Sequence, residues 1–434
     1  MEFDQLRGTV QGRVLGSGDE GFEQAAQPWN IAVAQPVAAV VEAANVADVA
    51  AVVRFARAAG RPVVAQPTGH GATGDIGAAI LLRTGHLNSV HIDAPARVAR
   101  VGAGARWGQV QAAAAEHGLT GLAGSNPVVG VTGYTLGGGK GWFARKYGWA
   151  SNAVRAFEIV TAEGEALRVT FDSDPELFWA LCGGGGDFAV VTALEFDLFP
   201  APALYGGRIM WSADRLPEVW DAFRELTSQA PDELSVWFQR FQFPEAPEMV
   251  ALDLAYLGDP AEGRALTAAL DRIGGAIADK RAPMSPAALG DITAEPTNPS
   301  PAISRAEVLT DLDDEAVKVL AGEPVAPLAN IQVRHLGGAL ARPAAGARGA
   351  LTEPYLVYLL GIGLPHLRDA VRAKQTAMVE SLADHISGAK PYTFLAPGES
   401  AADAFPAATL DRLRTIKRSR DPQNVIRANF PVLG

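Results

Sequence analysis

The sequence predicts an α+β protein, and three observations support this fold class. The first half of the 434 residues combines helical runs with many short strand-like runs separated by glycine-rich turns. After Pro200 the helical and strand-like segments become longer, which indicates a second α+β unit with an antiparallel sheet. From about Ala407 the chain forms a basic helical segment and a last strand-like run. We therefore expect three segments, 1–202, 203–390 and 391–434.

In the first half, residues 45–60 predict a helix, because Val49, Val52 and Val53 recur at helical spacing. Asn45 can cap its start and Gly60 can end it. The remaining elements follow in chain order: strands at 61–65 and 79–82 around a loop at 66–75, strands at 89–93 and 97–101, a helix at 106–117, and a strand-like run at 129–136.

The second half predicts helices at 216–229, 261–273 and 367–385, and strands at 234–241, 249–256, 331–335 and 355–361. A polar, proline-containing loop occupies 291–301. After the helix that begins near 407, residues 425–426 read as a short strand.

Composition excludes several function classes. The formal net charge is −11 and the Lys and Arg residues are scattered, which opposes binding to nucleic acid or to an anionic membrane. One cysteine, Cys182, can form neither an internal disulfide nor a cysteine zinc site, and we expect no metal. The sequence shows neither a signal peptide nor an apolar run long enough for a membrane span. We expect a soluble, cytoplasmic protein, and homo-oligomerisation stays open.

Four glycine-rich segments lie in the first half, at 67–75, 101–104, 124–141 and 183–186. Glycine lets the backbone approach a ligand and turn its N–H groups toward phosphates. Residues 139–144 fit the dinucleotide fingerprint G-x-G-x-x-A, but no clean strand precedes them and no alternating βαβ series follows. A Rossmann site is therefore the second choice, and a Walker A loop is absent from the sequence.

Several runs resemble, in the right order, the berberine-bridge-enzyme-like group of the vanillyl-alcohol-oxidase superfamily. They include QPTGHGATGD, VGAGARWGQV, GSNPVVGVTGYTLGGGKGWFARKYGWA, DPELFWALCGGGGDFAVVTALEFDLFP and LDRLRTIKRSRDPQNVIRANFPV. They cover the first 200 residues and the last 30, whereas the middle matches more loosely. The resemblance implies a two-part PCMH-type FAD-binding domain, to which 391–434 returns, and a separate substrate-binding domain at 203–390.

The resemblance also implies a cofactor site around His70, bonded to the 8α-methyl of the flavin. The other implied FAD contacts are Thr68, Gly69, Gly71, Ala72, Thr73, Gly74, Asn126, Val129, Gly130, Thr132, Gly133, Gly137, Gly138, Gly139, Gly141, Val190 and Asn429. Many relatives have a second link through a cysteine where this chain has Asn126, so we expect a single covalent link. A valine at the position of Val129 accompanies oxygen access, which favours an oxidase.

The implied reaction removes hydride from a C–H next to O or N of a small secondary metabolite, sugar or amine, and passes the electrons to molecular oxygen. The base is less defined. Relatives often have a Tyr-x-Asn-Phe segment where this chain has Pro391-Tyr392-Thr393-Phe394, so Tyr392 is one position off and on a strand would face the opposite side. The candidates are Tyr392, His335, Gln332 and Tyr134, with Arg334, Tyr355 and Tyr358. A dehydrogenase on this scaffold and a binding protein without catalysis remain alternatives.

Overall fold

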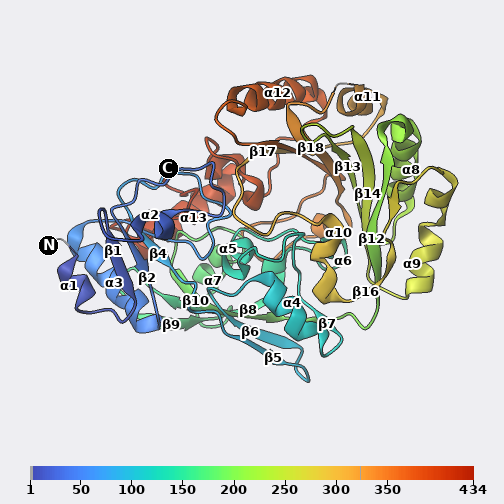
Figure 1. The fold of residues 1–434 in the computed structure, drawn as a ribbon. Helices are drawn as coiled ribbons and strands as arrows, with labels where there is room; N and C mark the ends of the chain where they lie inside the picture. Colours follow the sequence, from blue (N-terminus) through green and yellow to red (C-terminus); the bar gives the residue numbers. More distant parts are fainter. Residues whose placement is uncertain (1–2, 323) are drawn as a thin grey trace.

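A computed structural model describes residues 3–322 and 324–434. The ribbon divides into an N-terminal part on one side and a large antiparallel sheet on the other (Figure 1). Both marked chain ends lie in the N-terminal part, so the chain leaves it, builds the large sheet and comes back (Figure 1).

A four-stranded sheet opens the N-terminal part. Its strand order is β1 (Arg13–Gly16), β2 (Ala39–Glu42), β4 (Ile80–Arg83) and β3 (Val63–Ala65), with α1 (Asp4–Arg7) and α2 (Phe22–Ala26) nearby. Helix α3 (Val46–Ala59) packs its Val49, Val52 and Val53 into the core of this sheet. The predicted helix ends are confirmed, since Asn45 Oδ1 accepts the Asp48 N–H at 3.0 Å and Gly60 adopts a left-handed conformation.

A five-stranded antiparallel sheet follows. Its order is β5 (Val90–Asp93), β6 (Val98–Gly102), β10 (Val190–Asp197), β8 (Val154–Val160) and β9 (Ala166–Val169). Four helices pack into the same core: α4 (Trp107–Ala115), α5 (Val131–Leu136), α6 (Ala144–Tyr147) and α7 (Pro175–Leu181). A two-stranded ribbon pairs β7 (Leu119–Thr120) with β11 (Phe199–Pro200).

The strand-like prediction for 129–136 is wrong, because residues 131–136 form helix α5. The buried positions of this segment follow a helical repeat and not the alternation of a strand: they are Val131, Thr132, Thr135 and Leu136. Gly130 supplies the extended residue before the first turn.

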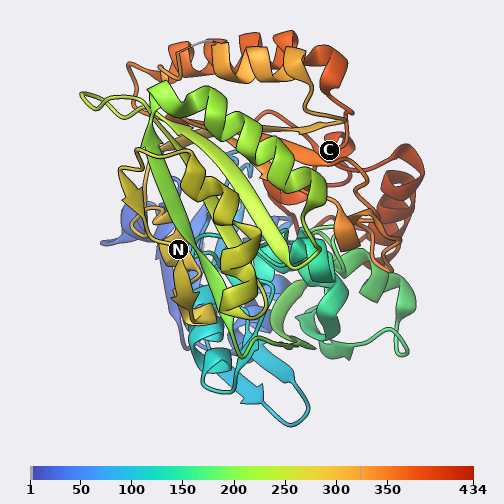
Figure 2. The same cartoon turned by 90° about the vertical axis from the view of Figure 1, so that its right-hand side faces the viewer.

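The large sheet runs β15 (Ala278–Asp279), β12 (Leu204–Ser212), β14 (Met249–Tyr256), β13 (Leu234–Phe241), β18 (Leu328–His335), β19 (Tyr355–Ile362) and β17 (Ala302–Leu309), with β16 (Ala282–Met284) paired to β12. Helices α8 (Leu216–Gln229), α9 (Pro260–Leu266), α11 (Asp314–Gly322) and α12 (Arg368–Ser381) lie on its outer side (Figure 2). The predicted helix at 216–229 and strands at 234–241 and 249–256 are confirmed residue for residue. The predicted helix at 261–273 is split, since a 3-10 turn at Ala268–Arg272 follows α9.

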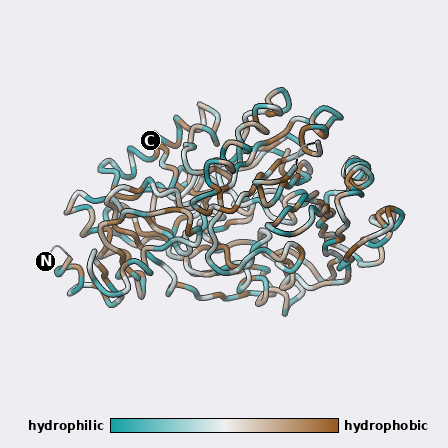
Figure 3. Tube along the Cα trace, turned by 45° about the horizontal axis from the view of Figure 1, so that its top comes forward, coloured by the Kyte–Doolittle hydropathy of each residue, from teal (hydrophilic) through white to brown (hydrophobic). Residues whose placement is uncertain are grey.

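The two faces of this sheet differ in polarity. Its outer face packs apolar residues such as Val236, Leu252 and Val333 against the helices. Brown, hydrophobic segments accordingly run through the interior of the molecule, whereas the outer helices alternate brown and teal (Figure 3). Its other face, here called the inner face, carries the polar or aromatic side chains of Arg208, Trp237, Gln239, Asp253, Asn330, Gln332, Arg334 and Tyr358. Trp237 stacks on Trp142 at a centroid distance of 3.8 Å, so this face meets the N-terminal part.

The C-terminal segment is tied to the N-terminal part. Helix α13 (Ala407–Arg420) contacts α7, and Ile426 forms a parallel bridge with Val63 of β3. Among the described residues, no helix combines the length and the apolar character that a membrane crossing requires. The segment boundaries at 202 and 390 stay predictions.

Candidate active site

His70 lies on the loop after β3, held from two sides. Its ring stacks on Trp29 at a centroid distance of 4.1 Å and an interplanar angle of 15°. Its Nδ1 lies 3.0 Å from the Thr68 hydroxyl oxygen. Its Nε2 is buried and has no hydrogen-bond partner among the described residues. The fixed ring therefore presents one free nitrogen.

Burial lowers the pKa of His70 to about 4, and the charge of Arg106 adds to this effect. At neutral pH the ring is therefore uncharged. If Nδ1 carries the proton and donates it to Thr68, the lone pair sits on Nε2, the atom without a partner. An uncharged imidazole with an accessible lone pair is a nucleophile or a hydrogen-bond acceptor.

Asn429 joins the far end of the chain to the His70 loop. Its Nδ2 donates to the Gly71 carbonyl at 2.7 Å, and its Oδ1 accepts from Gln66 Nε2 at 2.9 Å. The Thr73 hydroxyl donates to the Asn429 carbonyl at 3.2 Å. Three of the predicted cofactor residues, in segments more than 350 positions apart, are thus adjacent in space.

The other predicted cofactor residues adjoin the same region. A Cβ added at Gly130 would lie 3.5 Å from the Pro67 side chain, which places the start of α5 beside the His70 loop. Thr132 donates to the Ala103 carbonyl at 3.1 Å, within another glycine-rich segment. Val190, at the start of β10, is buried in the core that includes β3 and β4. Ala72 and Gly74 lie on the His70 loop and Gly133 lies in α5, so the structure brings these residues onto neighbouring elements.

Residues 137–141, here called the glycine loop, have no room for side chains at two positions. A Cβ at Gly139 would overlap the Tyr134 ring, and one at Gly141 would overlap the Ala123 carbonyl. Gly138 and Gly139 also have positive φ values of 101° and 75°. These glycines therefore let the loop backbone pack closely against Tyr134 and Ala123, and Lys140 carries its one side chain.

Asn126, which stands where the resemblance places the cysteine of a second flavin link, makes two hydrogen bonds within the protein. Its Nδ2 donates to the Pro296 carbonyl at 2.9 Å, and its Oδ1 accepts from the Val128 N–H at 3.1 Å. The predicted loop at 291–301 begins with a short helix, α10 (Gly290–Thr293), and is held at its other end too, since the Ser300 N–H donates to the Trp29 carbonyl. This loop therefore connects Trp29, which stacks on His70, with Asn126.

Two of the four catalytic candidates use their hydroxyl groups structurally. Tyr134 donates to the Leu122 carbonyl at 3.0 Å, and Tyr392 donates to the Phe430 carbonyl at 2.9 Å. Burial raises the pKa of Tyr134 and of Tyr392 far above the usual value, so both stay protonated. Tyr392 lies in a 3-10 turn, Tyr392–Phe394, so the strand geometry expected for it is wrong.

The other two candidates lie on β18 and point to opposite sides, as the alternation predicts. Gln332 accepts a hydrogen bond from Arg334 Nε on the inner face. His335 Nε2 lies 3.0 Å from Arg145 Nη1, which can only donate, so the His335 lone pair is occupied. The geometry disfavours all four as bases, and their catalytic roles stay predictions.

Lys140 is the functional candidate that sequence reasoning missed. The fingerprint at 139–144 allows any residue at position 140 and so gives this lysine no role. A lysine between two glycines in an apolar segment nevertheless indicates a buried amine, which is rare in proteins. In the structure it is 3% exposed, and its Nζ lies 4.7 Å from the centroid of the Trp237 ring.

His335 gives a prediction about acid stability. Burial, and then the charges of Arg145 and Lys140, lower the pKa of His335 to about 3 from 6.5. The unfolded chain therefore binds a proton that the folded chain does not, and folding stability falls as the pH drops from 6.5 toward 3. We expect His335→Gln, whose amide oxygen can still accept from Arg145, to lose less stability between pH 6.5 and 4.5, by on the order of 2 kcal/mol. Denaturant unfolding of both proteins at the two pH values measures this, and equal losses would contradict it.

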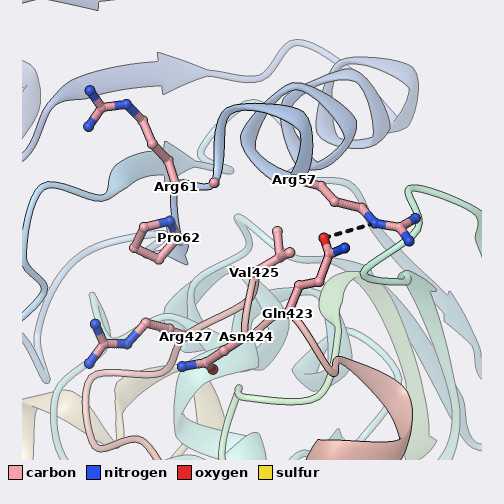
Figure 4. Close-up of a pocket in the computed structure, with 8 residues that line it drawn as sticks. Arg57, Arg61, Pro62, Gln423, Asn424, Val425 and Arg427 are labelled. Atoms are coloured by element: carbon pink, nitrogen blue, oxygen red, sulfur yellow. Dashed lines mark hydrogen bonds between the residues drawn. The ribbon is translucent and has the colours of Figure 1, made fainter.

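A basic hollow of about 210 Å³ lies between the end of α3 and the C-terminal segment (Figure 4). Arg57, Arg61 and Arg427 line it, and Arg57 Nε donates to Gln423 at 3.2 Å (Figure 4). None of the predicted site residues lines this hollow.

Comparisons with known proteins point to a flavin cofactor. Residues 37–170 match the family model described as FAD binding domain. The chain is 35% identical over 229 residues to (R)-6-hydroxynicotine oxidase of Paenarthrobacter nicotinovorans, which covers 50% of each protein. The chain thus aligns with about half the length of that curated relative.

Two solved structures share the whole fold. Berberine-bridge-enzyme-like 1 of Physcomitrella patens gives a TM-score of 0.86 at 19% identity, covering 99% of this chain and 98% of the other. Xylooligosaccharide oxidase of Myceliophthora thermophila gives a TM-score of 0.84 at 21% identity, covering 100% and 98%. Residues 37–170 thus match an FAD binding domain, half of the chain is related to an oxidase, and the chain shares the fold of these two solved structures.

Proposed function

We propose that this protein is an FAD-dependent oxidase that removes hydride from a C–H next to O or N of a small organic molecule. The observation that carries the proposal is the neutral, fixed imidazole of His70, with a free buried Nε2, on a loop beside other glycine-rich loops. The FAD binding domain match and the similarity to a nicotine oxidase support the cofactor and the reaction class.

The residues present fit FAD. The glycine loop carries no side chain other than that of Lys140, and Asn429 fixes the loop that carries His70. FAD, when bound, supplies the two-electron acceptor for hydride. His70 would hold the isoalloxazine through its Nε2, with Thr68 accepting the proton of Nδ1 and Trp29 fixing the plane of the imidazole.

The inner face of the large sheet forms the opposite wall. The polar side chains of this face, which include Arg208 and Arg334, can orient a substrate. The aromatic rings of Trp237 and Tyr358 can exclude water from the substrate. Molecular oxygen is the proposed final acceptor, with Val129 rather than a larger side chain beside the site. Because oxygen accepts two electrons and two protons, each turnover releases one hydrogen peroxide.

The experiment is anaerobic reduction of the purified holoprotein by a panel of alcohols, amines, sugars and hydroxy acids, followed by admission of oxygen. We expect at least one compound to bleach the flavin absorbance, and air to restore it with one hydrogen peroxide per flavin. Bleaching that only an artificial acceptor reverses would favour a dehydrogenase instead. Purification without flavin would overturn the proposal.

A further inference from the structure

Two buried cationic side chains face the same indole ring. Lys140 comes from the glycine loop and Arg334 from β18, and they are 3% and 7% exposed. Lys140 Nζ lies 4.7 Å and Arg334 Cζ lies 4.0 Å from the Trp237 ring centroid. We call Lys140, Arg334 and Trp237 the cationic subsite.

The walls of the cationic subsite are aromatic. Arg334 Cζ also lies 5.5 Å from the Tyr358 ring centroid and 5.2 Å from that of Phe394. Trp237 is in turn backed by Trp142, stacked at an interplanar angle of 10°. The charges therefore sit in surroundings of low polarity, where electrostatic interactions with a ligand are strong.

Most of the donors in the cationic subsite have no acceptor in the part of the chain that the structure describes. Arg334 makes one hydrogen bond, from Nε to Gln332, which leaves its two Nη groups free. Lys140 Nζ has the contact with Trp237 but no hydrogen-bond acceptor. Buried amine and guanidinium groups are normally hydrogen-bonded, so the free donors of Lys140 and Arg334 need a further explanation.

The nearby carboxylates do not supply it. Asp253 accepts from Arg208 at 2.5 and 2.8 Å and also from Gln239, so its oxygens are occupied. Burial lowers the pKa of Arg334, and the charge of Glu295, on the polar loop, opposes this shift, but no ion pair joins Arg334 and Glu295 among the described residues. The charge of Glu295 thus acts on Arg334 without an ion pair, and Lys140 has no carboxylate partner among the described residues.

We propose that the cationic subsite binds the carboxylate of the substrate, which makes the substrate class a small organic acid with an oxidisable C–H. This assignment rests on the proposed oxidase function. The two free Nη groups of Arg334 match the two oxygens of a carboxylate, and Lys140 adds a third donor from the glycine loop. Burial and the charge of Arg334 lower the pKa of Lys140, and a bound carboxylate would restore its proton.

The test is calorimetric titration of the holoprotein at pH 7.5 with acetate and benzoate. Acetamide and benzamide, which have nearly the same shape but no charge, serve as control ligands. We expect each acid to bind more tightly than its amide. Lys140→Met and Arg334→Met should each weaken binding of the acids roughly 10- to 100-fold and leave the amides unchanged. Lys280→Met, which removes an exposed lysine, should have no effect.

Thermal unfolding gives a second readout. Acetate should raise the Tm of the wild type but not that of Lys140→Met, and without ligand Lys140→Met should be at least as stable as the wild type, because an unpaired buried amine is removed. If Arg334→Met does not fold, Arg334→Lys replaces it. This variant should bind the acids more weakly than the wild type, because a lysine cannot donate two parallel hydrogen bonds to the two carboxylate oxygens.

Acids that bind no more tightly than their amides would overturn the proposal. Acid binding that survives in Lys140→Met and in the Arg334 variant would also overturn it and would place the anion elsewhere, for example at the hollow lined by Arg57 and Arg427. The titration needs no turnover. If the wild-type protein binds the acids but forms no peroxide with any substrate, the oxidase function is rejected and the anion site stands. If it forms peroxide only from uncharged substrates, the oxidase function stands and the acid specificity is rejected.

Discussion

Replacing His70 by alanine is expected to abolish covalent retention of the flavin. Denaturing mass spectrometry of the intact wild-type chain should show the mass of one FAD in addition to the polypeptide, and His70→Ala should show the polypeptide alone. The physical reason is that His70 Nε2 is the free nucleophilic atom of a neutral ring held by Trp29 and Thr68. Forming a C–N bond in place of a methyl C–H is a two-electron oxidation, for which oxygen is the final acceptor.

A matched control tests whether the effect is specific to this histidine. His91→Ala removes an exposed imidazole on β5 and should leave the adduct intact. Thr68→Val keeps the shape of the side chain but removes the acceptor of the Nδ1 proton, so the adduct should form more slowly. A wild-type chain without an FAD adduct, or an adduct that persists in His70→Ala, would contradict the assignment, even if the protein binds FAD noncovalently.

Replacing Lys417 by methionine is expected to destabilise the protein more than any other change considered. Lys417 is 0% exposed, and its Nζ donates to Asp421 Oδ2 and to the Asp187 carbonyl, each at 2.8 Å, and to the Ile426 carbonyl. Removing the amine leaves the Asp421 carboxylate buried without its cation. Such a loss costs about 3–5 kcal/mol, which equilibrium denaturation with guanidinium measures.

The same cluster fixes the C-terminal segment against the N-terminal part. The Asp187 carboxylate accepts the N–H groups of Ala428 and Val432 at 2.7 and 2.6 Å, on either side of Asn429. Lys417→Met should therefore also weaken flavin retention in the His70→Ala background, where no covalent bond holds the cofactor. Spin filtration of the double variant measures the flavin that is released.

Two further variants make the Lys417 prediction specific. Lys318→Met removes an exposed lysine on α11 and should change stability by no more than about 0.5 kcal/mol. Adding Asp421→Asn to Lys417→Met should recover part of the loss, because the uncompensated charge is gone. If Lys417→Met alone unfolds at the wild-type midpoint, the buried pair does not have the stabilising role assigned to it.

Local sequence signals determined much of the secondary structure. The helix at α3 was predictable with both ends, because its cap, its apolar repeat and its terminal glycine are all local. The strands β13 and β14 were predictable because each is a run of eight residues dominated by apolar and aromatic side chains. Helix α5 was not, since its short sequence contains a glycine and has a buried face that only packing against Ala103 and its neighbours reveals.

Among the predicted site residues, the sequence by itself singles out the glycine-rich segments, His70 and the absence of a cysteine at position 126, because these depend on residue type and order along the chain. Only the tertiary structure decided which side chains are free. It gives the hydroxyls of Tyr134 and Tyr392 backbone acceptors and gives His335 an arginine partner. It leaves Lys140 and Arg334 with free donors beside Trp237. The physical reason is that a hydrogen-bond partner is set by contacts between segments tens to hundreds of residues apart, which no local pattern encodes.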